Sequence, residues 1–476
     1  MMTPREIREK CAVFGICGAE DAARITFFGL YALQHRGQEG SGICCSDGTT
    51  LRAHRQAGLV NQIYTEEVIA KLHGSLAIGH NRYSTSGGSD HDHIQPIMGK
   101  DRLVAVAHNG NLPSTAALEV FLKKHGIAAQ NLTDSEMMAA AIKYYLIQGH
   151  SLSKAVAKAF PLFTGAFSLL VMTSDTLVAI RDHCGIRPLA LGQLEKAYVV
   201  ASETCAFDTI GATFMREVLP GEMVTITAGK LKSQQLAPPN QKLDIFEFVY
   251  FSRPDSYILG KSVDQVRKNM GAELARETEG LEADIVVPVP DSGITAAQGY
   301  AEASGIPLSF ALIKNRYIGR TFIQPEQQMR DVAVRMKLNP IRSALAGKRV
   351  ILVDDSIVRG TTSPQVIKLL KAAGAREVHF MVSSPPFRYP DFYGMDVPSQ
   401  EHLIAVHKTE EEIRDFLGVD SLHYLSYPGL IAATELPEDQ FCTSCFSGIY
   451  PIDLHERAEE VTTLPHWHGK QETLGL

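Results

Sequence analysis

The sequence predicts two domains, an α+β domain followed by an α/β domain with a parallel sheet. Up to about residue 231, most apolar runs are short or alternating, as in strands, and only two stretches have helical spacing. After residue 241, apolar strands alternate with helical patterns, as in a parallel sheet covered by helices. Between these regions lie Pro238 and Pro239, which suit neither a helix nor a central strand, so we expect the boundary there.

Length and composition limit the possible functions. The 476 residues, 45% of them hydrophobic and 21% charged, are too many for one ordinary domain. The net charge of −7 argues against general binding of nucleic acid or of anionic membranes. Eight cysteines in 476 residues do not form the dense disulfide framework of a small secreted domain, and no apolar segment approaches the ~20 residues of a membrane span. A cytoplasmic protein with reduced thiols is therefore expected.

In the first region, six runs predict strands and two predict helices. The strand runs are bounded by Gly, Ser and Asp and are CAVFGIC, SLAIGHNRYST, LVAVAHNG, FSLLVMT, AYVVASE and EMVTIT. One helix is expected in EDAARITFFGLYALQHRG, where apolar residues have helical spacing. The other should follow Thr133, which forms a potential capping box with Glu136. Helices and strands are segregated, so we expect packed α and β layers.

In the second region, the most informative stretch is RVILVDDSIVRGTTSPQVIKLLKAAG. Its apolar run predicts a buried parallel strand that brings Asp354 and Asp355 to the carboxyl edge of the sheet, where ligands bind. A short loop leads to Ser363 and Pro364, the expected N-cap and first residue of a helix. Backbone amides, hydroxyls and a helix N-terminus meet there, as in phosphate sites, and the carboxylates suit a ribose and Mg2+. The alternative is an acidic strand end followed by a polar turn and a capped helix.

The stretch VILVDDSIVRGTTS resembles the 5-phosphoribosyl-1-pyrophosphate (PRPP) motif of type I phosphoribosyltransferases. The resemblance implies that Asp354 and Asp355 bind the ribose and Mg2+, and that the 5-phosphate is bound by Arg359, Gly360, Thr361, Thr362 and Ser363. It also places Ser292, in PVPDSG, at the pyrophosphate and the metal, although helix capping explains that serine equally well. The segment IKNRYIGRTFIQP is either a solvated loop or, by resemblance, a lid whose cations bind PRPP, namely Lys314, Arg316 and Arg320.

Polar segments that follow Cys11 carry a second resemblance. In their order, QHRGQEGSG, GHNRYSTSGG, AHNGNL and LTDSE resemble the N-terminal-nucleophile glutaminase domain of class II glutamine amidotransferases, an αββα sandwich. Hydrolysis of an amide needs a nucleophile, a base, and donors for the developing oxyanion. A terminal cysteine carries its own base, because an α-amine has a pKa of about 7.7–8.0. The resemblance makes Cys11 the nucleophile.

The same resemblance assigns the other glutaminase residues. The side-chain amide of Asn109 and the backbone N–H of Gly110 would form the oxyanion hole, although a hairpin turn also explains this pair. Asp134 would receive the α-ammonium group of glutamine, although an acid at a helix start is also stabilised by the helix dipole. Arg82 would pair with the α-carboxylate, and the pocket would be completed by Arg36, Gly37 and Thr85.

The ten residues before Cys11 conflict with its role, because a blocked amine cannot act as a base. They contain no apolar core and so do not form a secretory signal. We therefore expect a propeptide that the enzyme itself removes by cleaving the bond between Lys10 and Cys11. The expected organisation is a propeptide (1–10), a glutaminase domain (11–240), a phosphoribosyltransferase domain (241–454) and a polar tail (455–476).

Together the two halves resemble the glutamine PRPP amidotransferase family over nearly the whole chain. This implies that ammonia released from glutamine at Cys11 replaces pyrophosphate at C1 of PRPP, giving 5-phosphoribosylamine, the first committed step of de novo purine synthesis. It also favours inhibition by purine nucleotides and a homo-oligomer, with a tetramer as the expected form. Two alternatives are another class II amidotransferase, such as an aminosugar or asparagine synthase, and a PRPP-sensing regulator. No sugar isomerase, ATP pyrophosphatase or DNA-binding pattern supports either one.

The sequence departs from the family at two sites. Ala12 replaces a usual glycine, and its methyl group could reshape the glutamine pocket. Many relatives with a propeptide bind a [4Fe-4S] cluster through four cysteines, of which Cys442 and Cys445 remain here, whereas the other two positions hold Asp244 and Asp391. Because cluster irons prefer thiolates, we expect the cluster to be absent. The remaining pair is then two free thiols in a turn or, alternatively, part of a Zn2+ site with His466 or His468.

Overall fold

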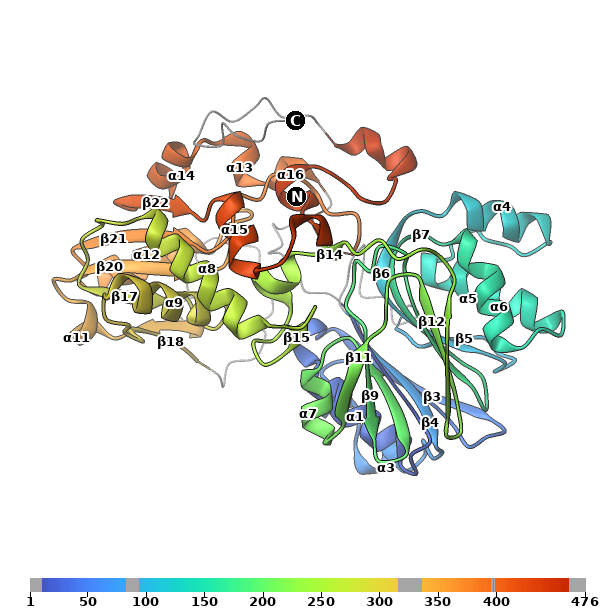
Figure 1. Cartoon of the computed structure of the whole chain (residues 1–476). Coiled ribbons are helices and arrows are strands. Elements are labelled where there is room, and N and C mark those ends of the chain that lie inside the picture. Colours follow the sequence, from blue (N-terminus) through green and yellow to red (C-terminus); the bar gives the residue numbers. More distant parts are fainter. Residues whose placement is uncertain (1–10, 83–93, 316–335, 395–396, 398, 462–476) are drawn as a thin grey trace.

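The computed structural model describes residues 11–82, 94–315, 336–394, 397 and 399–461 (Figure 1). Two lobes are visible in Figure 1. We refer to residues 11–240 as the N-terminal half and to residues 241–461 as the C-terminal half. In the part of the chain that the structure describes, no helix has the length and apolar character needed to cross a bilayer.

The N-terminal half contains two antiparallel sheets stacked face to face. One has the strand order β11-β9-β10-β1-β4-β2-β3 and the other β13-β12-β8-β7-β6-β5. Six of these strands were predicted: β1 (Ala12–Cys17), β4 (Leu76–Arg82), β6 (Ala105–Ser114), β7 (Thr164–Met172), β10 (Ala197–Ala201) and β12 (Glu222–Thr227). Seven were not: β2 (Gly40–Ser46), β3 (Leu51–Ala57), β5 (Ile97–Met98), β8 (Leu177–Arg181), β9 (Ala190–Leu194), β11 (Thr213–Glu217) and β13 (Lys230–Gln235).

Helices cover the outer faces of both sheets, which gives the predicted αββα layers. Against the first sheet pack α1 (Ala22–Ala32) and α7 (Cys205–Ile210), with the short α2 (Val60–Ile63) and α3 (Glu66–Ile69) nearby. Against the second pack α4 (Ala116–Lys124), α5 (Asp134–Ile147) and α6 (Leu152–Ala159). The predicted capping box at α5 is confirmed, because the Thr133 N–H donates to Glu136 Oε2 at 2.8 Å and the Glu136 N–H donates to Thr133 Oγ1 at 3.3 Å.

The C-terminal half is built on the predicted parallel sheet, in the order β17-β20-β21-β22. Its strands are β17 (Ile285–Pro288), β20 (Arg349–Asp354), β21 (Glu377–Val382) and β22 (Ser421–Tyr424), and shorter pairs are formed by β14 (Leu243–Asp244), β15 (Tyr257–Ile258), β16 (Lys261–Ser262), β18 (Leu312–Lys314), β19 (Leu338–Pro340) and β23 (Phe441–Cys442). The helices are α8 (Val263–Glu277), α9 (Ile294–Ser304), α11 (Arg342–Leu345), α12 (Ser363–Ala372), α13 (Ile404–His407), α14 (Glu410–Leu417), α15 (Tyr427–Thr434) and α16 (Ser444–Ser447).

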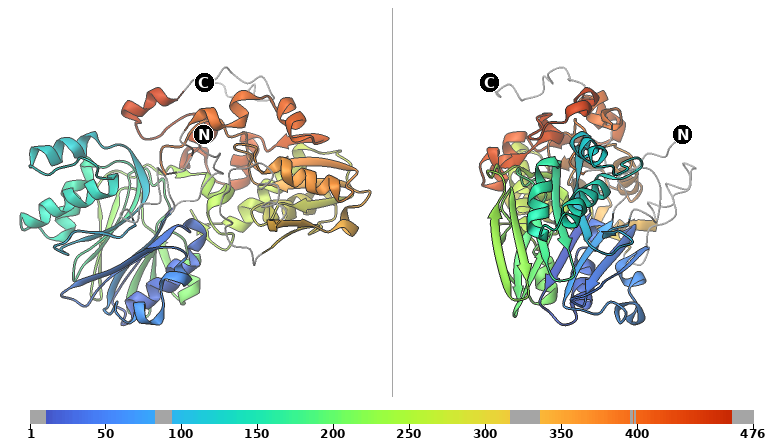
Figure 2. Two further views of the ribbon diagram at one scale, coloured as in Figure 1. Left: turned by 180° about the vertical axis from the view of Figure 1, so that it is seen from behind. Right: turned by 90° about the vertical axis from the view of Figure 1, so that its right-hand side faces the viewer.

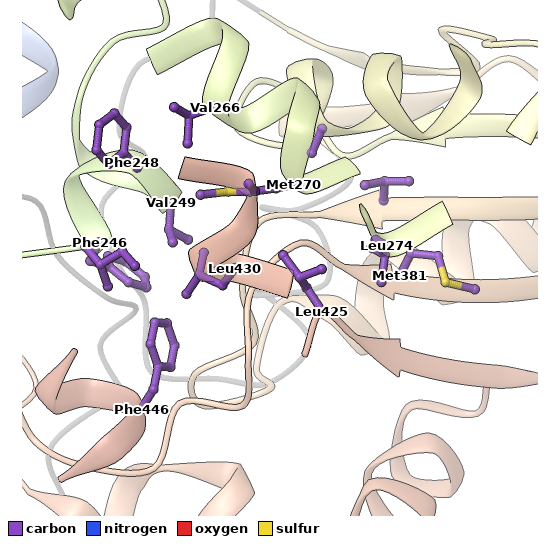
Figure 3. Close-up of a cluster of buried hydrophobic side chains, with 14 of the residues drawn as sticks. Phe246, Phe248, Val249, Val266, Met270, Leu274, Met381, Leu425, Leu430 and Phe446 are labelled. Carbon is purple, nitrogen blue, oxygen red and sulfur yellow. The ribbon is translucent and has the colours of Figure 1, made fainter. Parts of the chain in front are cut away.

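Alternate residues of this sheet enter different cores. Ile351 and Val353 of β20 face α8, α9 and α15, whereas Val350 and Leu352 face α12 and α14. The first of these cores continues into the segment that leaves the N-terminal half, through Phe246 and its neighbours (Figure 3). One local prediction was wrong: α12 begins at Ser363 itself and Thr362 is its N-cap, because Pro364 occupies the second position of the helix and not the first.

The two halves contact each other at more places than the segment that links them. After Pro238 and Pro239 the backbone runs along the N-terminal half, where the Asn240 and Lys242 N–H groups donate to the carbonyls of residues 183 and 184 at 3.0 and 2.7 Å. At the other end of the chain, the short helix His455–Glu460 returns toward the N-terminal half (Figure 2). There Ser114 Oγ, at the end of β6, donates to Glu456 Oε2 at 3.1 Å. The first part of the expected polar tail therefore contacts the N-terminal half.

Candidate active sites

Cys11 lies directly before β1, at the end of the first sheet. Ala12 pairs with Asn81 of β4, so the antiparallel register brings Cys11 opposite Arg82. Gly37 lies against the same strand end, because a Cβ atom built on it would be 2.8 Å from the Arg82 backbone. Three residues predicted for the glutaminase site therefore meet here, whereas Thr85 lies outside the described residues.

Strand alternation places Cys11 and Arg82 on the face that meets the second sheet. Val13 and Cys17 of β1 and Ile78 of β4 enter the core between the sheets. Cys11 is an even number of residues from Val13 and Cys17, and Arg82 from Ile78, so their side chains point to the same face. Ala12 is one residue further along the strand, so it points to the opposite face of the sheet and is buried in the core beneath α1. Its methyl group therefore lies on the face opposite Cys11, which gives no support to the expectation that it reshapes the pocket.

Asn109 and Gly110 lie within β6, where they pair with Ser168 and Phe167 of β7. The hairpin interpretation is therefore wrong. Gly110 has φ of 147°, and a Cβ atom there would be 2.0 Å from the Ala166 carbonyl oxygen, so only glycine fits. Asn109 is 1% exposed, and its side-chain nitrogen has no hydrogen-bond partner among the described residues. A buried donor without an acceptor is costly to keep, and an oxyanion hole requires such a donor.

Asp134 is the first residue of α5 and lies beside the same strand. Its Oδ2 accepts from the Leu112 N–H at 3.2 Å, two residues beyond Gly110, and its Oδ1 accepts from the Ser135 N–H at 2.6 Å. It is thus an acid at a helix start, and it also lies close to the predicted oxyanion strand. Both interpretations of Asp134 are compatible with this position.

Two buried histidines that the sequence analysis did not identify form hydrogen bonds between the elements of the site. His80 Nε2 donates to the His108 carbonyl at 3.1 Å and ties β4 to β6 across the two sheets. His108 Nδ1 lies 2.9 Å from Ser135 Oγ and ties β6 to α5. Burial, helped by the nearby His108 and Arg82, lowers the pKa of His80 to about 3, so this ring is a neutral structural donor.

Arg36 enters a buried chain of alternating charges at the junction of the two halves. Its guanidinium pairs with Glu203 of the N-terminal half and, through Nη2, with Glu247 Oε2 of the C-terminal half at 2.5 Å. Arg187 continues the chain, with Nη1 3.2 Å from Glu247 Oε1 and 2.9 Å from Asp244 Oδ2. The Arg36 guanidinium therefore lies in the domain junction, and its part in the glutamine pocket stays a prediction.

The four positions that correspond to cluster ligands lie close together, but their side chains do not suit the cluster. Asp244 pairs with Cys442 between β14 and β23, and the N–H groups that follow Phe387 donate to the Cys445 carbonyl at 3.0 and 3.1 Å. Arg187 engages the carboxylates of Asp244, at 2.9 Å, and Asp391, at 3.8 Å.

The two thiols of this site are buried, and Cys442 pairs with Asp244 between β14 and β23. Burial and the carboxylate of Asp244 raise the pKa of Cys442 and Cys445 above the ordinary thiol value. Within the described ranges, no group of three or more His, Cys, Asp and Glu side chains is arranged to hold a metal ion. His466 and His468, named for the alternative zinc site, lie outside those ranges.

In the C-terminal half, the predicted PRPP residues Asp354, Asp355 and Ser292 meet at the carboxyl edge of the sheet. Asp354 ends β20, and its Oδ1 accepts from the Asp355 N–H at 3.0 Å. Ser292, just after the neighbouring β17, makes a side-chain hydrogen bond to Asp354. Burial and the adjacent carboxylate of Asp355 raise the pKa of Asp354 well above its usual value, so a cation bound here would relieve an unfavourable concentration of negative charge.

The predicted phosphate loop leads from this edge into α12, where Gly360 and Ser363 are buried and Thr361 is exposed. Arg359 and Thr362, the N-cap, complete the loop. Lys314, at the end of β18, forms an ion pair with Asp291 at 2.7 Å, next to Ser292. Arg316 and Arg320 of the expected lid lie outside the described residues.

Comparisons with known proteins match both halves. The model of the glutamine amidotransferase domain matches residues 80–209, and that of the phosphoribosyl transferase domain matches residues 260–386. The amidophosphoribosyltransferase of Bacillus subtilis is 46% identical over 469 residues, 97% of each chain, and that of Synechocystis sp. is 49% identical over 452 residues, 93% of this chain and 91% of the relative. The solved structure of the B. subtilis glutamine PRPP amidotransferase complexed with ADP and GMP is 45% identical, with a TM-score of 0.87, and covers 96% of this chain and 100% of that chain.

Proposed function

The chain belongs to the amidophosphoribosyltransferase family, and from this membership we propose how its own residues divide the reaction. The family activity joins hydrolysis of glutamine to replacement of the pyrophosphate of PRPP by ammonia, an entry into purine synthesis. For the first step, we assign Cys11 as the nucleophile, after removal of residues 1–10. Its freed α-amine takes the thiol proton while the sulfur attacks the amide carbonyl, and collapse of the adduct releases ammonia. Water then hydrolyses the thioester to glutamate and restores the thiol.

The observation that carries this assignment is the buried side-chain nitrogen of Asn109, which has no hydrogen-bond partner among the residues that the structure describes. Together with the Gly110 N–H it would stabilise the oxyanion of the adduct, and Cys11 shares the inter-sheet space with it. We assign Arg82 to the α-carboxylate of glutamine and Asp134 to the α-ammonium group. The remaining pocket residues are proposed to be Arg36, Gly37 and Thr85.

For the transferase step, we assign the 5-phosphate to the residues at the start of α12, namely Arg359, Gly360, Thr361, Thr362 and Ser363. Asp354, Asp355 and Ser292 would hold Mg2+ and the ribose, and the raised pKa of Asp354 supports a cation there. Mg2+ bound at this edge would neutralise charge on the departing pyrophosphate. The same group would be bound by Lys314, Arg316 and Arg320. Ammonia adds to C1 as the C1–pyrophosphate bond breaks, and the amine that forms loses a proton.

We further propose that the protein contains no [4Fe-4S] cluster. Support comes from the two aspartates, whose carboxylates Arg187 engages, because cluster irons prefer thiolate ligands. Purine nucleotides are proposed as inhibitors, since the B. subtilis relative was solved with ADP and GMP. A homo-oligomer, specifically a tetramer, and a cytoplasmic location complete the proposal, without nucleic-acid or membrane partners.

Glutamate release with and without PRPP tests the proposed function. We expect PRPP to stimulate glutaminase activity and glutamate and pyrophosphate to appear in equal amounts, because the two half-reactions are joined. A class II amidotransferase of another type would release no pyrophosphate from PRPP. A PRPP-sensing regulator would bind PRPP and release neither product, and either result would refute the assignment.

A further inference from the structure

The two halves touch at the strand that carries the predicted oxyanion hole. Asn111, the residue after Gly110 on β6, donates from Nδ2 to the Phe392 carbonyl of the C-terminal half at 2.7 Å. Beside this bond, a Cβ atom built on Gly394 would lie 3.2 Å from the Gly110 carbonyl carbon, so the two backbones are in contact. The C-terminal half therefore reaches the backbone of the glutaminase site directly.

The chain around Phe392 is firmly held. Phe392 and Tyr393 are 1% and 0% exposed. Arg187 donates from Nε and Nη2 to the Tyr393 carbonyl, both at 3.1 Å, and the Tyr393 hydroxyl donates to the Ile452 carbonyl at 2.7 Å. In a close-packed interior, such a segment cannot shift without moving its neighbours. A displacement of Phe392 would therefore be felt by Asn111 and Gly110.

The segment that contains Phe392 begins at the carboxyl edge of the parallel sheet, where PRPP is proposed to bind. Asp354 pairs with Val382 of β21, and the Ser383 N–H donates to the Asp354 carbonyl at 2.9 Å. Residues 383–394, hereafter the connecting segment, are mostly buried, and the ring of Phe387 lies 5.6 Å from that of Phe246. One buried segment thus runs from the ribose-binding carboxylates to the oxyanion strand.

We propose that Asn111 is a positioning residue through which occupancy of the PRPP site adjusts the glutaminase oxyanion hole. This rests on the proposed function. Ligand contacts at Asp354 bias the position of the connecting segment, and the Asn111–Phe392 hydrogen bond passes that bias to the Gly110 N–H. Small displacements suffice, because stabilisation of an oxyanion depends on donors at the correct distance and angle. The benefit is that glutamine is hydrolysed mainly when an acceptor for ammonia is bound.

The test is the stimulation ratio, defined as glutaminase activity with saturating PRPP divided by activity without it. Asn111→Ala removes the donor, and we expect the ratio to fall about 3- to 10-fold, in line with the loss of one hydrogen bond in the coupling path. Basal glutaminase activity and ammonia-dependent transferase activity should stay at wild-type values. The isosteric Asn111→Asp, which also lacks the donor, is the second variant if the first fails to fold.

Ser114→Ala is the matched control. Ser114 lies on the same strand and also bonds to the C-terminal half, at Glu456, but not to the connecting segment. We expect it to keep the wild-type ratio. An unchanged ratio in the Asn111 variants, with a stimulated wild type, would overturn this inference alone, and so would an equal fall in Ser114→Ala. A wild type without stimulation would overturn the proposed function and this inference with it.

Discussion

Replacing Cys11 by alanine is expected to abolish ammonia production from glutamine and to spare the use of free ammonia. The variant lacks the proposed nucleophile, so glutamine-dependent turnover should fall by at least about 10³-fold. The residues proposed for the transferase step lie in the other half, so added ammonium salt at alkaline pH should still release pyrophosphate from PRPP. Glutamate and pyrophosphate assays on the same preparation measure both effects.

Cys17→Ala is the control for this variant. Cys17 ends the same strand, is buried, and burial together with Asp175 raises the pKa of its thiol to about 11, so it should play no part in catalysis. Glutamine-dependent activity retained in Cys11→Ala would show that another group is the nucleophile. Loss of both activities would show that the two sites do not divide the reaction as proposed.

Replacing Arg187 by methionine is expected to lower the free energy of unfolding by about 3–5 kcal/mol, the usual cost of removing one partner of a buried charge pair. The variant leaves the carboxylates of Asp244 and Glu247 buried without this cation, which now lies 2.9 and 3.2 Å from them. Thermal unfolding of wild type and variant measures the difference. Arg24→Met, which breaks the exposed pair with Glu66, should have little effect.

Treatment with a chelator is a second test of the junction between the two halves. We expect ion pairs, and not a metal cluster, to stabilise this junction. Anaerobically purified wild-type protein should contain no stoichiometric iron, sulfide or zinc, and a chelator should leave its melting temperature unchanged. A full complement of iron and sulfide, or a marked fall in melting temperature with chelator, would contradict the metal-free junction.

Much of the fold, and the place in the fold of several candidate site residues, was predictable because the determining signals are local. The run before Asp354 and the turn after it specify a buried strand, a loop and a helix start within one short stretch. The Thr133 capping box likewise needs only neighbouring residues, and the structure contains it. Such signals predict that an element exists but not its exact boundary, as the start of α12 at Ser363 shows.

Other features depend on partners far away in the sequence. Arg36 and Glu203 are 167 positions apart, and Asn111 and Phe392 are 281 apart, so no local pattern links them. Strand β3 is largely polar and partly exposed, and its pairing with β2 is what makes it a strand. For Arg187, the sequence offers one signal of a buried ion pair: it is a single charged residue in the apolar stretch GIRPLALG.

The mass of the purified, active protein tests the central claim most directly, since that claim requires a free amine on Cys11. The account predicts a mature chain that begins at Cys11 and lacks residues 1–10, with glutamine-dependent activity proportional to the processed fraction. A chain that still begins at Met1 and turns over glutamine at the full rate would contradict it.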